Sequence, residues 1–292
     1  MFHGPNGTRQ IFYFRVFSNL LREPTSLAGL LIILGFIGTA LVVAIGRSYI
    51  TPHSPTELDF SAALQAPSWN HLFGTDRYGR DLFSRILSAT PTDASISFVV
   101  ITSAVAIGFI GGLASYRGGV SDEVVMRITD VFLAFPSLVL TLAIAVILGP
   151  GITNSSIALI ATWWPTYARL ARAEALRIKN YDFVRISKVS GIPSWRIFVK
   201  HIIANSMPTI ISYATLDLGG VVLSYAGLSY FGLGAQPPQA EWGTEISAGQ
   251  TYLLVAPWWA MIPGIIIVII AIGFALLGDG VRDAFSKEFA SK

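Results

Sequence analysis

Long stretches without a single Asp, Glu, Lys or Arg restrict the fold of this chain more than any other feature. Two of them, residues 24–46 and 94–116, are mostly apolar and carry no charge. A helix that spans a bilayer needs about 20 such residues, and it satisfies its own backbone hydrogen bonds in lipid. Charged residues make up only 13% of the chain, against about 25% in soluble domains. We therefore predict an all-α integral membrane protein rather than a soluble enzyme.

Further apolar runs bring the predicted number of transmembrane helices to six. Residues 131–168 are too long for one span, and Gly149-Pro150-Gly151 should divide them into two helices. Residues 201–225 and 252–277 supply the last two spans. We predict three parts: a cytoplasmic segment 1–26, a transmembrane domain 27–278 and a cytoplasmic tail 279–292. The transmembrane domain would include an extracytoplasmic segment at 47–94 and a cytoplasmic loop at 176–200.

The distribution of basic residues sets the predicted orientation. Six spans place both termini on one side of the membrane, and 16 of the 20 Lys and Arg residues then fall on that side. Cytoplasmic loops carry an excess of Lys and Arg, so we expect both termini in the cytoplasm. The net charge of +3 is too small to indicate a nucleic-acid partner. The predicted location is the cell membrane, which the chain crosses several times.

The extracytoplasmic segment ends in an amphipathic stretch. Its apolar side chains are spaced as one face of a helix, formed by Leu82, Phe83, Ile86 and Leu87. Asp81 and Arg85 are one helical turn apart, a spacing at which they can form an ion pair.

Motifs for catalysis are missing from the sequence. It has no Gly-Lys dipeptide and therefore no phosphate-binding Gly-x-x-x-x-Gly-Lys-Ser/Thr loop. It also lacks a His-Glu-x-x-His metal pair and a Gly-x-Ser-x-Gly nucleophile elbow. The absence of cysteine excludes disulfides and thiolate zinc sites. We predict no catalytic residue, metal site or cofactor, and we expect that the chain is not an enzyme.

Asp217 is the one carboxylate well inside a predicted span. A charge in the bilayer is costly, so such a residue is by default a candidate for function, here ion coupling or substrate contact. The alternative is a structural carboxylate that is capped by neighbouring hydroxyls or backbone donors. The sequence leaves both interpretations open.

The most informative segment lies between the fourth and fifth spans, where residues 169–200 carry eight basic and two acidic side chains. Asp182 should cap a short helix that begins at Phe183. Gly191 should end this helix, because Pro193 cannot continue it, and Ser194 should cap the next one. In the short helix, one face is apolar (Phe183, Ile186 and Val189) and another is basic (Arg185 and Lys188).

This pattern predicts a compact helical element on the cytoplasmic side of the membrane. Such an element suits docking into the groove of a partner protein. The alternative is an ordinary basic loop that obeys the positive-inside rule and contacts anionic lipid.

Several motifs, in order along nearly the whole chain, resemble the inner permease subunits of oligopeptide/dipeptide-type ABC importers. They are Ala66-Pro67-Ser68, His71-Leu72-Phe73-Gly74-Thr75-Asp76, Gly79-Arg80-Asp81-Leu82-Phe83-Ser84-Arg85, Ala134-Phe135-Pro136 after Asp130, Leu228-Ser229-Tyr230-Phe231-Gly232-Leu233-Gly234, Trp242-Gly243 and Gly278-Asp279-Gly280-Val281-Arg282-Asp283.

The resemblance assigns the loop at 176–200 a role in coupling to ATPases. In this family the loop begins Glu-Ala-Ala and has a Gly six residues after the Glu. Gly191 matches that Gly, while Arg185, Ile186 and Ser187 occupy the Glu-Ala-Ala positions, so a base replaces the leading acid. The residues expected in this coupling site are Asp182, Phe183, Arg185, Ile186, Ser187, Lys188, Gly191 and Pro193.

The resemblance also implies a fold, partners and a substrate class. The fold would be that of a type I ABC importer permease. The partners would be a second related permease subunit, two cytoplasmic ATP-binding subunits, an extracytoplasmic solute-binding protein and membrane lipid. The expected substrate is a di- or oligopeptide, although related permeases also move nickel or oligosaccharides, and no substrate-binding residue is identified. A remote alternative is an ion-coupled secondary carrier that uses Asp217.

Overall fold

The regular structure of the chain is helical throughout the residues that the computed structural model describes, 16–114 and 118–290, which confirms the all-α class. The five long helices in these ranges are α2 (Pro24–Ile50), α3 (Leu82–Ala114), α6 (Ile152–Lys179), α9 (Ala204–Tyr230) and α11 (Pro257–Ala290). The shorter elements are α4 (Val120–Leu133), α5 (Ser137–Leu148), α7 (Asp182–Val189), α8 (Ser194–Ile197), the π-helical η3 (Phe198–Ile203), α10 (Trp242–Gly249), and the 3-10 turns η1 (Phe60–Ala62) and η4 (Gln250–Tyr252).

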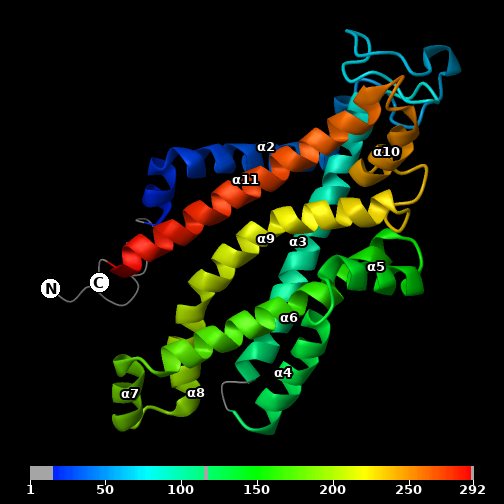
Figure 1. Cartoon of the computed structure of the whole chain (residues 1–292). Helices are drawn as coiled ribbons and strands as arrows, with labels where there is room; N and C mark the ends of the chain where they lie inside the picture. The colour runs from blue at the N-terminus through cyan, green and yellow to red at the C-terminus, as the bar shows by residue number, and fades with distance from the viewer. Residues whose placement is uncertain (1–15, 115–117, 291–292) are drawn as a thin grey trace.

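The long helices form an elongated bundle. α11 packs between α2 and α9, and α3 packs along α6 (Figure 1). α7 and α8 lie at one end of the molecule, whereas α10 and the irregular segment before α3 lie at the other (Figure 1). The two segments that the sequence assigns to opposite sides of the membrane are therefore at opposite ends of the bundle.

Four helices in the described ranges are long and apolar enough to cross a membrane: Pro24–Gly46, Leu82–Leu113, Ser194–Tyr230 and Pro257–Lys287. The pair α4 and α5 adds a fifth if the two are counted as one bent span. By length and composition, the described residues thus contain four to five candidate spans, compared with the six that we predict from the sequence. α6 does not meet the same criterion, and its second half carries Arg169, Arg172, Arg177 and Lys179.

Two helix breaks differ in how well the sequence predicts them. The expected break at Gly149-Pro150-Gly151 is confirmed between α5 and α6, with a φ of 85° at Gly149 and 138° at Gly151. A second break, between α4 and α5, is missing from our prediction of one helix from 131 onward. Pro136 ends α4 because proline has no N–H to donate and disfavours α geometry at the residue before it. The two helices meet at 92°.

α3 joins two segments that the sequence treats separately. The extracytoplasmic amphipathic stretch and the second span form one helix of 33 residues, which continues through Pro91. Its start is fixed by Asp81, whose Oδ2 accepts a hydrogen bond from the N–H of Ser84 at 2.8 Å. This is the usual geometry of an N-cap carboxylate.

Glycines allow α3 to approach α6 closely. A Cβ atom on Gly108 would lie 2.4 Å from the carbonyl oxygen of Trp164, and one on Gly112 would lie 2.3 Å from that of Ala168. Both distances are shorter than a van der Waals contact, so only glycine fits. Small residues at such positions are typical of helix packing in membranes, where dispersion contacts replace the hydrophobic effect.

Candidate functional site

The loop between α6 and α9 folds into the short helix that its sequence predicts, with boundaries shifted by one residue. α7 spans Asp182–Val189, and Tyr181 is its N-cap, with no side-chain capping bond. The prediction that Asp182 caps the helix is therefore wrong. Asp182 instead occupies the first turn, where a carboxylate interacts favourably with the helix dipole. The predicted cap at Ser194 is wrong by one residue as well, because Pro193 is the N-cap of α8 and Ser194 is its first residue.

Gly191 ends α7 as predicted. Its φ is 75°, a conformation that glycine adopts without the steric cost of a Cβ atom. The N–H of Gly191 donates to the carbonyl of Lys188 at 3.1 Å, and the N–H of Ile192 donates to that of Ser187 at 3.1 Å. These two bonds form a Schellman motif, which fixes the direction in which the chain leaves the helix.

A single buried side chain attaches α7 to the rest of the protein. Val184 is fully buried and belongs to an apolar cluster with Ile178 of α6, Ile197 of α8 and Ile202 of η3. The ring of Phe183 also lies 5.5 Å from that of His201, measured between centroids. α7 therefore contacts the end of α6 on one side and, on the other, α8 and η3, the segments that lead into α9.

The opposite face of α7 is apolar and exposed. Phe183 is 39% exposed, Ile186 64% and Val189 91%. These three residues are the apolar face that the sequence predicts, and Ile186 and Val189 are its most exposed members. Arg185 is exposed beside them. Exposed apolar side chains gathered on one element are typical of an interaction site.

Three of the eight basic residues in the segment 169–200 already pair with acidic residues of this chain. Arg172 makes two hydrogen bonds, of 2.6 and 2.8 Å, to Asp122 of α4. Arg169 pairs with Asp130 at 2.6 Å, and Arg177 pairs with Glu174 at the same distance. All three arginines lie on α6, where Arg169 and Arg172 connect it to α4 and Arg177 pairs within the helix. The basic residues beyond α6 that are left for a partner are Arg185, Lys188, Arg196 and Lys200.

Asp217 accepts a hydrogen bond from a hydroxyl group, as expected if it is a structural carboxylate. The hydroxyl of Tyr167 on α6 donates to Asp217 Oδ2 at 2.8 Å. Tyr167 is fully buried, so the bond joins α6 to α9 inside the bundle. Among the described residues, no Lys, Arg or His forms an ion pair with Asp217.

The opposite end of the molecule contains a buried ion pair that the sequence does not reveal. Arg85 contacts Glu245 of α10, with Nη2 at 2.5 Å from Oε1. The predicted pair of Arg85 with Asp81 is therefore wrong. Asp81 caps α3 with one oxygen and contacts His71 Nδ1 at 3.0 Å with the other. An N-cap side chain folds back over its own first turn, which leaves Arg85 free to extend to α10.

His53, His71 and Asp81 form the one group in the described ranges that could hold a metal ion. Their potential ligand atoms all lie within 4.8 Å of one another. Each side chain already has a hydrogen bond, because His53 Nε2 lies 2.9 Å from the carbonyl oxygen of Asn70 and His71 contacts Asp81.

Comparison with known proteins shows consistent similarity. Residues 104–291 match the family described as binding-protein-dependent transport system inner membrane component. The chain is 41% identical to a probable D,D-dipeptide transport system permease protein of Escherichia coli K12, over 86% of this chain and 85% of that protein. It is 37% identical to a dipeptide transport system permease protein of Alkalihalophilus pseudofirmus, over 94% and 90%.

Two further matches are a permease for another substrate and a solved structure. A nickel transport system permease protein of E. coli K12 is 34% identical, over 85% of this chain and 90% of that protein. In three dimensions, a chain of the inward-facing MetNI methionine ABC transporter matches with a TM-score of 0.57, over 70% of this chain and 97% of that chain. At 18% identity, this last similarity concerns the fold alone, which is that of a type I importer permease.

Proposed function

The chain belongs to the family of binding-protein-dependent transport system inner membrane components, and on this premise we propose that it admits dipeptides through an ATP-driven importer. It is a permease component of an ABC importer, and it forms half of the translocation pathway together with a second, related permease. The substrate class is supported by the two dipeptide permeases that match the chain over most of its length.

α7 is the proposed contact with the cytoplasmic ATPases. The observation that carries this proposal is its division into a buried face at Val184 and an exposed apolar face at Phe183, Ile186 and Val189. ATP binding closes two ATPase subunits together, and α7 moves with them. The cluster around Val184 passes the movement to α6 and α9, which shift as rigid bodies between two arrangements of the pathway.

The proposed orientation places α7 in the cytoplasm and α10, with the segment before α3, outside the membrane. Both termini are then cytoplasmic, and the outer end of the bundle receives the solute-binding protein. The excess of Lys and Arg in the segments that would be cytoplasmic supports this orientation. The membrane would be the cell membrane.

The absence of cysteine allows a direct test of the orientation. A single Ile186→Cys substitution should react with a membrane-impermeant maleimide in inside-out vesicles and not in right-side-out vesicles. Thr56→Cys, in the exposed segment before α3, should show the opposite pattern. Labelling of both positions from the same side would refute the proposed orientation.

ATPase docking is tested by replacing two exposed apolar residues of α7. Ile186→Ser with Val189→Ser should weaken ATPase binding about 30-fold, since central apolar contacts dominate such interfaces. Dipeptide uptake into proteoliposomes should fall with it. Val120→Ser with Val124→Ser removes two exposed valines of α4 and should have little effect. Equal ATPase binding in both pairs of variants would reject α7 as the docking element.

Nickel import is a second candidate, favoured by the cluster of His53, His71 and Asp81 at the proposed outer end and by the nickel permease relative. In this case the metal is the cargo. Reconstituted transporter supplied with radiolabelled nickel and with a labelled dipeptide distinguishes the two. The second candidate would be favoured if the wild-type transporter takes up nickel and no dipeptide, and if nickel uptake is lost in His53→Ala.

A further inference from the structure

A cavity of about 940 Å³ lies beside α7, between the ends of α3, α4 and α6 and the start of the α8–η3 segment. Its lining is mostly apolar, with Phe109, Ile110 and Leu113 from α3 and Phe198 and Ile203 from η3. Lys179 and Lys188 are its charged residues. Large apolar cavities with a few well-placed polar groups are the usual form of small-molecule sites.

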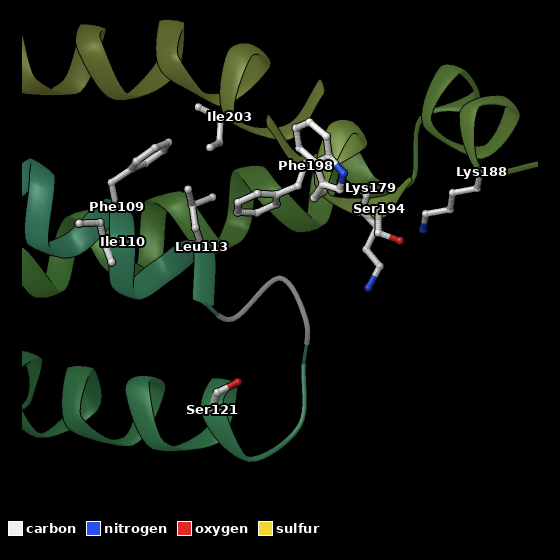
Figure 2. Close-up of a pocket in the computed structure, with 10 residues that line it drawn as sticks. Phe109, Ile110, Leu113, Ser121, Lys179, Lys188, Ser194, Phe198 and Ile203 are labelled. Atoms are coloured by element: carbon white, nitrogen blue, oxygen red, sulfur yellow. The ribbon is translucent and has the colours of Figure 1, made fainter. Parts of the chain in front are cut away.

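The apolar and basic groups occupy different ends of this cavity. Figure 2 shows Phe109, Ile110 and Ile203 together at one end, whereas Ser194, Lys179 and Lys188 lie at the other. The apolar end is lined by the last turns of α3, within the uncharged stretch 94–116 that we assign to the second span. The basic end lies at α7, beyond that span. The polarity of the cavity therefore changes along its length as it does in a phospholipid.

Lys188 faces the cavity and not the exposed apolar face of α7. With 100° between successive residues of a helix, Lys188 lies on the side of α7 opposite to Ile186 and close to the buried Val184. No described acidic residue forms an ion pair with it. Its ammonium is thus available to an anion in the cavity, while Arg185 is directed outward.

The wall of the cavity also has an irregular backbone. η3 is a π-helical segment, Phe198–Ile203, inserted between α8 and α9. Such segments occur mostly as short insertions in α-helices and frequently lie at functional sites. Here the segment supplies both Phe198 and Ile203 to the lining.

We propose that this cavity binds one anionic phospholipid of the inner leaflet, with its phosphate at Lys179 and Lys188 and an acyl chain against α3 and η3. The inference rests on the orientation given under Proposed function, because the cytoplasmic leaflet carries the anionic lipids. The bound lipid contacts α7, α6 and η3 together and so stabilises the element that would receive the ATPases. A protein partner fits the cavity less well, since its apolar end lies within a membrane span.

Native mass spectrometry of the purified full chain in detergent tests the proposal, with phosphatidylglycerol as the probe. Neutralising both lysines, as Lys179→Gln with Lys188→Gln, should weaken binding of the first lipid about 30-fold, the effect of removing two charges near an anionic surface. Arg185→Gln with Lys200→Gln removes the same charge from the same region outside the cavity and should change binding less than about twofold.

Further measurements separate the alternatives. Phosphatidylcholine should bind at least about 10-fold more weakly than phosphatidylglycerol, and glycerol phosphate, which has no acyl chain, should not compete. Ile110→Trp, at an exposed position, should fill the apolar end and reduce lipid binding with no change in thermal midpoint.

Three results would overturn the proposal. The first is an equal loss of lipid binding in the two double variants, which would indicate diffuse attraction. The second is competition by glycerol phosphate, which would indicate a phosphate site without a chain. The third is loss of ATPase binding in Lys179→Gln with Lys188→Gln while lipid binding persists, which would make the cavity a protein interface. Because lipid binding is measured on the permease alone, failure of the dipeptide or α7 tests leaves it unaffected.

Discussion

Arg85 of α3 and Glu245 of α10 form a buried ion pair across 160 positions of sequence, with Nε at 2.7 Å and Nη2 at 2.5 Å from the same carboxylate oxygen. Both side chains are almost completely inaccessible. Their remaining polar groups are also bonded, since Arg85 Nη1 donates to the carbonyl of Pro55 at 2.7 Å and Trp259 Nε1 donates to Glu245 Oε2 at 2.9 Å. The pair therefore joins α3, α10, α11 and the irregular outer segment.

Breaking this pair should destabilise the protein strongly. Glu245→Leu leaves the Arg85 guanidinium buried without its counter-charge, which costs about 3–5 kcal/mol. Replacing both residues, as Arg85→Met with Glu245→Leu, removes the stranded charge and should restore part of the loss. Thermal unfolding of the detergent-solubilised permease measures both. A double variant that is less stable than Glu245→Leu would contradict this account.

The stability of the outer end should depend on pH through Glu241. This residue caps α10 by accepting hydrogen bonds from the N–H groups of Gly243 and Thr244 at 2.9 and 2.8 Å. Burial raises its pKa from 4.5 to about 7, against the opposing effect of the two N–H donors, and Asp93 of α3 lies beside it. Because the pKa is raised on folding, the contribution of Glu241 to stability is fully present below pH 4.5 and is lost as the pH rises through about 7.

We therefore expect the thermal midpoint to fall between pH 5 and pH 8, with a smaller fall in Glu241→Gln, which stays uncharged and keeps one capping oxygen. Glu57→Gln, at an exposed position, is the matched control and should retain the full pH dependence. An unchanged slope in Glu241→Gln would show that another group is responsible.

Neighbouring glycines of α3 should tolerate a methyl group very differently. A Cβ on Gly112 meets the backbone of α6 at 2.3 Å, whereas one on Gly111 meets Val125 at an ordinary 3.6 Å. Gly112→Ala should therefore separate the two helices and cost about 1–3 kcal/mol. Gly111→Ala should be neutral or stabilising, because alanine has the higher helix propensity. Equal thermal midpoints for the two variants would mean that α3 and α6 pack less closely.

Asp217 should prove structural rather than ion-coupling. Asparagine at this position keeps a side-chain oxygen that can accept from Tyr167, so Asp217→Asn should preserve ATP-driven uptake and create no dependence on a proton or sodium gradient. Tyr167→Phe removes the donor and leaves the partly buried carboxyl without this bond, which should lower stability by about 1 kcal/mol. Uptake that follows an ion gradient in the wild type and fails in Asp217→Asn would favour a secondary carrier.

Features that depend on a few adjacent residues could be predicted from the sequence. The helical class, the break at Gly149-Pro150-Gly151 and the end of α7 at Gly191 are confirmed because each is fixed by local backbone preferences. The two helix caps lie one residue before the predicted Asp182 and Ser194, since Tyr181 and Pro193 adopt the non-helical backbone angles of an N-cap.

Features that depend on distant residues could not be predicted. The bond from Arg85 to Glu245 and the cavity beside Lys188 require contacts between segments far apart in the chain. The roles of Arg169, Arg172 and Arg177 were obscured for a related reason. A count of bases does not distinguish those that already pair within α4 and α6 from those left for a partner.

The unbroken course of α3 has a mechanical consequence. At about 1.5 Å per residue its 33 residues extend for about 50 Å, well beyond the hydrocarbon thickness of about 30 Å. The helix is held near its start by the ion pair of Arg85 with Glu245, and near its end by the close packing of Gly108 and Gly112 against α6. In the proposed orientation, a tilt of this helix at one end would displace its other end in the opposite direction, so α3 would link the two surfaces of the membrane directly.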